Sequence, residues 1–261
     1  MSQPLLQLDR ATIRFGGLTA VGDFSLNVHA NELVGLIGPN GAGKSTAFNL
    51  ITGVYQPTGG TIHFGGRSIQ GMKPHDLTKL GIARTFQNIR LFGSLSVFDN
   101  VRAATQLHRA NGIRCALWRG AGFHRAEKEV EATVLELLDI FDLGRLRDEE
   151  AKSLPYGDQR RLEIVRALAT KPKLLLLDEP AAGMNPTEKD ELMKLIKFIQ
   201  TKFQIAIMLV EHDMKVVMGI CEKIAVLEYG KKIAEGTPDE IQKDPKVIAA
   251  YLGTEGEDDD A

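Results

Sequence analysis

The sequence has few cysteines, little excess charge and no long hydrophobic run, and each shortage excludes a class of protein. Its 261 residues include two cysteines, Cys115 and Cys221, without partner spacing or a nearby histidine cluster. This pattern argues against a disulfide framework or a zinc site and favours a cytosolic chain with buried or idle thiols. The formal net charge is −2. Because nucleic-acid-binding domains are usually basic, we expect no nucleic-acid partner.

No stretch of the chain approaches the roughly 20 apolar residues that are needed to span a bilayer. The longest apolar runs, KLLLLDEP and IAIMLVEHD, have the length of strands. The first residues, MSQPLLQLDRATIRF, lack a basic start followed by a long apolar segment, so we expect no signal peptide. We therefore expect any action at a membrane to go through a partner protein.

Segments with the patterns of strands and helices alternate in the last third of the chain. They are 173–178, 186–202, 205–210, 214–220 and 223–228. Such alternation predicts a parallel sheet with crossover helices, an α/β fold. Near the N-terminus, residues 23–29 alternate, with Phe24, Leu26 and Val28 on one face. The apolar run at 33–38 is typical of a buried parallel strand.

The middle of the chain has helical patterns. Ser96 followed by Asp99 predicts a helix start, because both side chains can satisfy backbone amides of the first turn. A core-facing apolar stripe at helical spacing is formed by Val130, Val134, Leu137, Leu138 and Phe141. A second helix is predicted in RRLEIVRAL, with Leu162, Val165 and Leu168 on one face. We predict one domain over 1–254, with a core of about 1–87 and 165–254 and a helical sub-domain of about 88–164. The acidic tail 255–261 is predicted to be disordered, with an interaction tail as the alternative.

The segment LVGLIGPNGAGKST has the spacing of a phosphate-binding loop, directly after a predicted strand and at the head of a predicted helix. The residues of the predicted loop are Gly38, Pro39, Asn40, Gly41, Ala42, Gly43, Lys44, Ser45 and Thr46. Glycines let backbone amides turn inward around phosphate oxygens, and the helix N-terminus adds partial positive charge. Lys44 can reach the β- and γ-phosphates, and Ser45 can ligate magnesium.

Polar residues follow two of the predicted strands. Asp178 and Glu179 come after four leucines, and His212 follows IAIMLVE. Because ligands bind at the carboxyl edge of open α/β sheets, Asp178 can hold magnesium through water and Glu179 can orient or deprotonate a water. The alternatives are a solvated strand end for the acidic pair and a structural hydrogen bond for His212. Pro180 is expected to bias Glu179 toward extended backbone.

Two further residues carry weaker signals. Gln87 follows a short strand at the border of the predicted helical sub-domain, where a glutamine has no obvious core role. Phe15 precedes Gly16 and Gly17, so its ring can stack on a base or pack in the core.

These elements, in this order, resemble those of an ATP-binding cassette (ABC) ATPase over almost the whole chain. The resemblance implies a P-loop NTPase core with a mainly parallel sheet, an N-terminal antiparallel β portion and an inserted α-helical sub-domain. It implies that Phe15 stacks on adenine of ATP with Val21 nearby, and that Ser45 and Gln87 ligate Mg²⁺, with Asp178 behind a water. Glu179 becomes the general base, and His212 holds the γ-phosphate and the attacking water.

The stretch SLPYGDQRRLEIVRAL resembles the signature of this family, usually Leu-Ser-Gly-Gly-Gln. Here the turn is Leu154, Pro155, Tyr156, Gly157 and Asp158. In the family, this turn caps the ATP of the opposite subunit. Pro155 has neither a hydroxyl nor a backbone N–H, so it cannot donate what serine donates. The helix amides that follow are expected to keep their dipole contribution.

Three longer segments, YGDQRRLEI, RTFQNIRLFGSLSVFDNV and GTPDEIQKDPKVIAAYLG, resemble the ATPase subunit of bacterial high-affinity branched-chain amino acid importers. Such importers pair two different ATPase subunits with two membrane permease subunits and a periplasmic solute-binding protein. The resemblance implies a peripheral subunit on the cytoplasmic face of the plasma membrane, with Leu91, Phe92 and Leu95 as docking candidates or as core residues. The alternatives are a urea or amide importer, a soluble repair or translation ATPase, and a degraded regulatory cassette.

Overall fold

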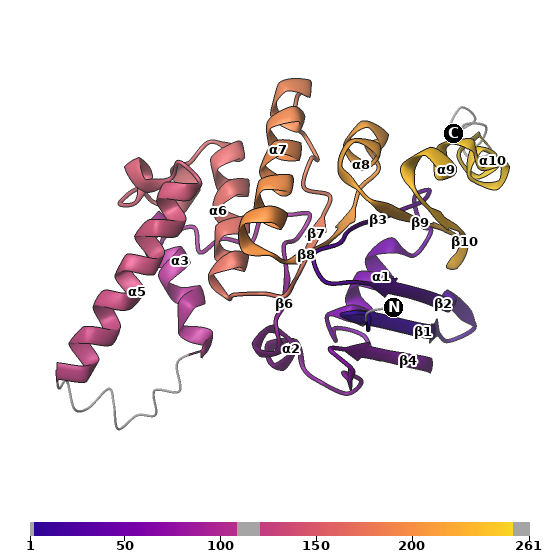
Figure 1. Cartoon of the computed structure of the whole chain (residues 1–261), viewed down its shortest axis with the longest axis horizontal. Coiled ribbons are helices and arrows are strands. Elements are labelled where there is room, and N and C mark those ends of the chain that lie inside the picture. The colour runs from indigo at the N-terminus through magenta and orange to yellow at the C-terminus, as the bar shows by residue number, and fades with distance from the viewer. Residues whose placement is uncertain (1–2, 109–120, 253–261) are drawn as a thin grey trace. The chain divides into compact units, whose positions relative to one another are not determined.

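The structure is a computed structural model that describes residues 3–108 and 121–252 (Figure 1). It divides into two compact units, which we call the core unit, 1–77 with 173–261, and the helical unit, 78–172. The predicted sub-domain of about 88–164 falls within the helical unit. Cys115 and the acidic tail lie outside the described residues.

An antiparallel sheet forms the N-terminal part of the core unit. Its strands are β1 (Leu6–Phe15), β2 (Leu18–Val28), β4 (Gly59–Phe64) and β5 (Arg67–Ser68), in the order β2-β1-β4-β5. All pairs are antiparallel. The predicted alternation in β2 is confirmed, because Phe24, Leu26 and Val28 are buried while the residues between them are not.

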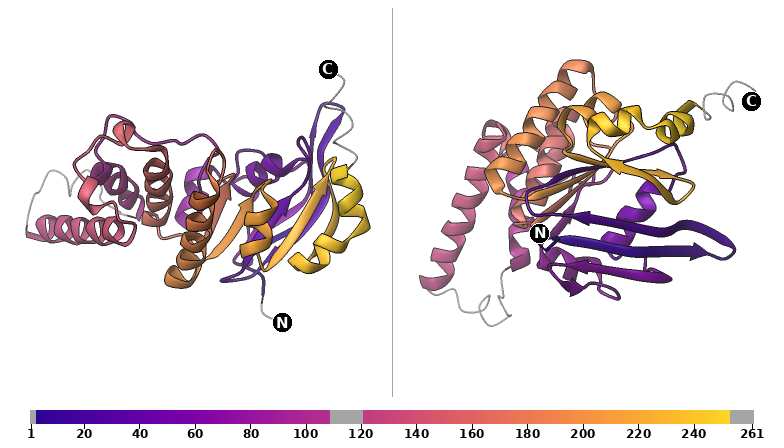
Figure 2. Two further views of the ribbon diagram at one scale, coloured as in Figure 1. Left: turned by 90° about the horizontal axis from the view of Figure 1, so that it is seen from above. Right: turned by 45° about the vertical axis from the view of Figure 1, so that its right-hand side comes forward.

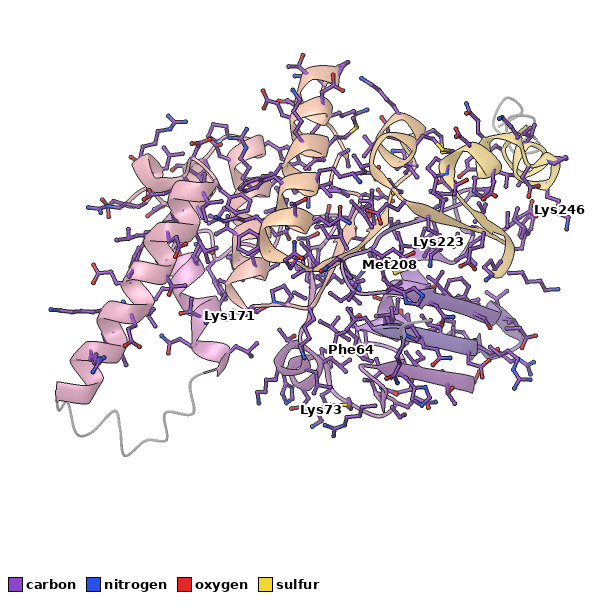
Figure 3. All side chains as sticks on the ribbon, viewed as in Figure 1. Phe64, Lys73, Lys171, Met208, Lys223 and Lys246 are labelled. Atoms are coloured by element: carbon purple, nitrogen blue, oxygen red, sulfur yellow. The ribbon has the colours of Figure 1, made fainter. Side chains whose placement is uncertain are left out.

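A second, mainly parallel sheet fills the centre of the core unit. Its strands there are β3 (Leu33–Ile37), β7 (Leu174–Asp178), β8 (Ala206–Val210), β9 (Lys223–Glu228) and β10 (Lys231–Gly236). They lie in the order β10-β9-β3-β8-β7. Only β10, at the edge, runs antiparallel to its neighbour. Every residue of β3, β7 and β8 is buried, including Met208, labelled in Figure 3. The predicted α/β class is confirmed.

Helices of the core unit pack on both sides of the parallel sheet. They are α1 (Lys44–Ile51), α7 (Pro186–Phe203), α8 (Met214–Ile220), α9 (Pro238–Lys243) and α10 (Pro245–Leu252). Helix α1 lies between the two sheets, and α7 and α8 cover the opposite face (Figure 2). Asn185 caps α7 in a capping box, and Asp213 caps α8. A 2.5 Å ion pair between Lys189 and Asp213 joins these two helices.

Two side chains close to the sheets of the core unit are notable, one for its bridging contacts and one for its burial. Lys223, labelled in Figure 3, donates to the Asn27 carbonyl at 2.6 Å and pairs with Glu32 at 2.8 Å, so it joins β9 to the end of β2. Cys221 is buried, and burial raises the pKa of its thiol to about 12. The prediction of a buried thiol is confirmed for this cysteine.

The helical unit contains strand β6 (Ile82–Arg84) and helices α3 (Val97–Thr105), α5 (Ala121–Ile140) and α6 (Tyr156–Ala169), and helix α2 (Pro74–Leu80) spans the boundary. Three short 3₁₀ turns join them, at Gln106–His108, Gly144–Leu146 and Ala151–Ser153. The predicted cap is confirmed, since the Ser96 hydroxyl accepts the Asp99 N–H at 3.0 Å. The stripe on α5 is buried at Val134, Leu137 and Leu138. None of the helices in the described part of the chain is long and apolar enough to cross a membrane.

Candidate functional site

The predicted phosphate loop connects β3 to α1, and its backbone requires glycine at two positions. Gly38 has a φ of 148°, and a Cβ added there would lie 2.0 Å from the Leu227 carbonyl oxygen. Gly43 has a φ of 100°, and its added Cβ would lie 2.7 Å from the Ala20 oxygen. Only glycine fits such backbone angles and such close approach without strain. The curled shape of the loop is therefore set by its own backbone and by the neighbouring carbonyl groups.

Lys44 lies inside this curl. It is only 8% exposed, and its Nζ donates to the carbonyl oxygens of Gly38 at 2.6 Å and Pro39 at 2.9 Å. Burial lowers the pKa of Lys44, and the negative charges of Glu179 and Asp178 oppose that shift. The structure thus places this ammonium group within electrostatic reach of both strand-end carboxylates. Ser45 follows in the first turn of α1 and is exposed.

The acidic pair stands at the carboxyl end of β7. Asp178 is buried, while the Glu179 N–H donates to the Val210 carbonyl at 2.9 Å and turns the chain sharply. The expectation that Pro180 holds Glu179 in an extended conformation is wrong, because the φ of Glu179 is 45°. A non-glycine residue costs about 1–3 kcal/mol in this region. The bond to β8 fixes the turn against that strain.

Glu179 and His212 come together across the ends of β7 and β8. The Nδ1 of His212 is 3.8 Å from the Oε2 of Glu179. The imidazole is 60% exposed and the carboxylate 19% exposed. A solvent-facing imidazole beside a shielded carboxylate can hold a water and an anionic group at one place. The structure therefore brings both predicted catalytic residues to one edge of the sheet.

Sequence reasoning did not single out Glu211, which is 1% exposed. Its Oε1 accepts the Ala181 N–H at 2.7 Å, and its Oε2 accepts the His212 N–H at 3.2 Å. Burial raises the pKa of Glu211, and backbone amides at Ala181 and Asp213 oppose the shift. This carboxylate ties the loop after Glu179 to the loop that carries His212. A charged residue directly after an apolar strand was the available signal.

The predicted adenine contacts differ in exposure. The Phe15 ring is 45% exposed at the tip of the β1–β2 hairpin and meets Tyr55 edge to face, with centroids 5.2 Å apart. Val21 is fully buried, and its Cγ2 would touch a Cβ on Gly43 at 3.2 Å. Val21 therefore supports the phosphate loop. Gly230 joins the same parts, donating to the Ala42 carbonyl and accepting from the Gly22 N–H.

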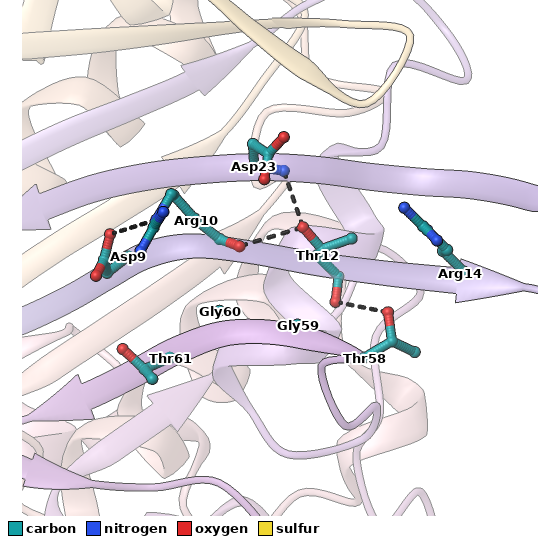
Figure 4. Close-up of a pocket in the computed structure, with 9 residues that line it drawn as sticks. All are labelled: Asp9, Arg10, Thr12, Arg14, Asp23, Thr58, Gly59, Gly60 and Thr61. Carbon is teal, nitrogen blue, oxygen red and sulfur yellow. Dashed lines mark hydrogen bonds and ion pairs between the residues drawn. The ribbon is translucent and has the colours of Figure 1, made fainter.

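A separate open pocket of about 510 Å³ lies on the antiparallel sheet. Figure 4 shows Thr12 at its centre, where the hydroxyl accepts the Asp23 N–H at 3.0 Å and the carbonyl accepts the Thr58 hydroxyl at 3.1 Å. Arg10 pairs with Asp9 at its edge. None of the residues that line it belongs to the phosphate loop or to the ends of β7 and β8.

In the helical unit, Gln87 is exposed in the loop after β6. The signature turn opens α6, with Pro155 at the N-cap and no side-chain cap. The Pro155 carbonyl accepts the Gln159 N–H at 3.0 Å, so the helix still starts cleanly. Asp158 lies 3.9 Å from Arg161. Leu154 is buried, and Pro155 and Tyr156 are exposed.

Comparison with known families gives a single answer. The family model described as "ABC transporter" matches residues 21–182, which include the phosphate loop, Gln87, the signature turn and the acidic pair. The chain belongs to the ABC transporter family. A second model, of branched-chain amino acid ATP-binding cassette transporters, matches residues 231–257, which include β10, α9 and α10.

Relatives of this ABC protein match nearly all of its length. It is 44% identical to the high-affinity branched-chain amino acid transport ATP-binding protein BraF of Pseudomonas aeruginosa, over 97% of this chain and 99% of the relative. It is 46% identical, with the same coverage, to the corresponding protein LivG of Salmonella typhimurium. Among solved structures, the ADP conformation of MJ1267, an ABC transporter cassette, matches with a TM-score of 0.83 and 29% identity over 97% of this chain and all of that one.

Proposed function

We propose that this chain is the ATP-binding and ATP-hydrolysing subunit of a membrane importer for branched-chain amino acids. The observation that carries the proposal is the meeting of Lys44, Asp178, Glu179 and His212 at one edge of the core unit. The full-length relatives and the model that matches residues 231–257 support the choice of cargo. The geometry of this edge supports ATP hydrolysis by this chain, while the cargo is handled by the transporter as a whole.

Each residue of this edge has a distinct task in hydrolysis. The inward amides of the phosphate loop and the Lys44 ammonium hold the phosphates of ATP, while Phe15 stacks on its adenine. Glu179 accepts the proton of the attacking water, and the hydrogen bond from its N–H to the Val210 carbonyl holds its backbone in place. His212 holds the water and the γ-phosphate. Glu211 positions the backbone of His212 and Ala181.

The donors at this edge fit Mg²⁺, which prefers hard oxygen ligands. Ser45 offers a hydroxyl in the first turn of α1 and Asp178 a carboxylate at a strand end. The resemblance to the family assigns Gln87 as a further ligand through its amide oxygen. No group of three His, Cys, Asp or Glu residues suited to a metal is found among the described residues. Few protein ligands are typical of magnesium that is shared with substrate phosphates. The ion supplies charge neutralisation to the phosphates when it is bound.

The proposed assembly holds two ATPase subunits, this chain and a different paralogue, below two permease subunits on the cytoplasmic face of the plasma membrane. A periplasmic solute-binding protein delivers the cargo to the permeases. Phe92 and Leu95 are exposed in the helical unit, at 52% and 38%, and we assign them to permease docking together with the less exposed Leu91. In this assembly the signature turn caps the ATP held by the other ATPase subunit.

The test is transport by the assembled complex. The full chain is purified from membranes with its permease partners, placed in liposomes, and supplied with ATP on the side of the ATPase. We expect ATP-dependent uptake of leucine, isoleucine or valine and none with the Glu179→Gln chain. Uptake of urea or short amides instead would show that the complex carries these compounds and not branched-chain amino acids. Failure to co-purify with any membrane protein would favour a soluble ATPase.

A further inference from the structure

Arg160, in the second turn of α6, is a charged side chain buried in the helical unit. It is 1% exposed and is among the largest fully buried side chains of the described chain. A buried guanidinium is costly unless it is paired and hydrogen-bonded. Its neighbour Arg161 leaves 37% of its side chain exposed. The burial of Arg160 therefore needs a reason in its contacts.

Those contacts run to the loop that carries Gln87. The NH1 group of Arg160 donates to the Phe86 carbonyl at 2.7 Å, and the NH2 group donates to the Gln87 carbonyl at 2.8 Å. NH2 also donates to the Tyr156 hydroxyl in the signature turn at 3.1 Å. One planar guanidinium thus reaches both the signature turn and the peptide groups beside Gln87.

Glu163, one turn later in α6, also contacts the loop that carries Gln87. Its Oε2 accepts from Arg160 NH1 at 2.8 Å, and its Oε1 accepts the N–H groups of Phe86 at 3.3 Å and Arg90 at 3.2 Å. It is 5% exposed. The loop after β6 lies outside the strands and helices, so its peptide groups need partners from side chains or water. The ion pair supplies donors and acceptors on both sides of Gln87, whose own side chain is exposed.

We propose that Arg160 and Glu163 are positioning residues that fix Gln87 to α6, the helix that begins at the signature turn and that we call the signature helix. When the signature turn moves, the Gln87 backbone moves with it, so the two elements act as one piece. The proposal rests on the proposed function, because it takes Gln87 as a ligand of the nucleotide site. Two rigid carbonyl contacts require the fork of arginine, and a lysine ammonium cannot reproduce them.

The test compares Arg160→Lys and Glu163→Gln with Arg125→Gln, a control on α5 at a side chain that is 86% exposed. In the full chain we expect the kcat for ATP to fall roughly 10- to 100-fold in the first two variants, since small misplacements of positioned groups have effects of this size. KM for ATP should stay unchanged, because the phosphate loop is intact. Arg125→Gln should behave as the wild type.

A double-mutant cycle separates positioning from general loosening. If Arg160 acts through Gln87, then Arg160→Lys added to Gln87→Ala should lower kcat no further than Gln87→Ala alone. Effects that multiply would overturn the proposal. A Gln87→Ala chain with normal kcat would overturn it together with the role of Gln87. Absence of ATP turnover in the unmodified chain would instead defeat the proposed function.

Hydrogen exchange keeps the proposal testable if one variant folds poorly. In Glu163→Gln, we expect the amides of Phe86 and Arg90 to exchange faster, while the amides in the middle of α6 keep their wild-type rates. Equal protection of both loop amides in the variant and the wild type would show that Glu163 does not hold the loop, and would overturn the proposal.

Discussion

The phosphate loop and the signature turn both carry glycine, but the fold demands it in only one of them. Gly38 has a positive φ, and the Leu227 carbonyl leaves no room for a side chain there. Gly157 has no positive φ, sits within α6, and an added Cβ would meet nothing within 4 Å. The first loop is shaped by its own chain. The second leaves space that the described residues do not fill, and the proposed assembly places the other ATPase subunit there.

The two regions are also held differently. The phosphate loop is fixed by backbone contacts, such as that from Gly230 N–H to the Ala42 carbonyl at 3.0 Å. The signature helix is fixed to the Gln87 loop by the buried side chains of Arg160 and Glu163. Backbone curvature suits a rigid cradle for phosphate. Side-chain bridges suit an element that transmits movement between sites. The phosphate loop is therefore shaped by its own backbone, whereas α6 is joined to the Gln87 loop through side chains.

The largest expected effect is on hydrolysis by the preformed site. Glu179→Gln keeps the shape of the side chain but removes the base, so ATP turnover should fall roughly 10²–10⁴-fold while ATP binding persists. Steady-state ATPase assays and nucleotide titrations check this. Glu131→Gln, on the exposed side of α5, is the control. Near-normal turnover in the Glu179 variant would remove it from the role of base.

The demand for glycine in the phosphate loop is tested by stability. Gly38→Ala should lower the free energy of unfolding by about 2–5 kcal/mol, because a positive φ costs about 1–2 kcal/mol and overpacking about 1–3 kcal/mol. Gly41→Ala is the matched control, since its φ is also positive but its added Cβ meets nothing within 4 Å. It should cost only about 1–2 kcal/mol. Equal losses would show that contact with Leu227 is unimportant.

A substitution at Pro155 tests the contribution of the signature turn. Pro155→Ser restores a hydroxyl at the N-cap, so ATP-driven association of ATPase subunits should strengthen by at most about 1.5 kcal/mol, the low end for a hydrogen bond to a charged group. Light scattering with and without ATP in a Glu179→Gln background measures this. Pro155→Ala removes the ring without adding the hydroxyl and serves as control. Weaker or unchanged association in the serine variant would show that the helix amides alone carry the capping.

The smallest effect is expected at Gly157. Gly157→Ala should raise the free energy of unfolding by about 0.5–1 kcal/mol, because alanine is favoured over glycine inside a helix. The same methyl group should weaken ATP-driven association, because it fills the space kept for the partner. Thermal unfolding and light scattering on one preparation give both values. A loss of stability would mean that the fold itself requires this glycine.

Sequence patterns predicted which side chains share the sheet edge where those side chains follow strands, and failed where backbone groups are the partners. Lys44, Asp178 and His212 follow the hydrophobic runs of strands β3, β7 and β8, so the sheet edge could be predicted. The contact between Arg160 and the Gln87 carbonyl spans 73 residues and joins a side chain to a peptide group. Every residue has a backbone carbonyl, so a contact to one leaves no pattern in the sequence. The positive φ of Glu179 was missed because a following proline favours extended backbone. In the structure, the hydrogen bond from the Glu179 N–H to the Val210 carbonyl outweighs that preference.

The most direct measurement is ATP affinity of the dilute, monomeric full chain. Lys44→Ala should weaken binding roughly 10- to 100-fold, corresponding to about 1.5–3 kcal/mol for hydrogen bonds to a charged group. Lys73→Ala, at an exposed lysine labelled in Figure 3, should leave binding unchanged. Gly157→Asp should bind ATP like the wild type and yet fail to associate in its presence. If Gly157→Asp weakens monomer binding as Lys44→Ala does, the signature turn serves the chain's own nucleotide and the account is contradicted.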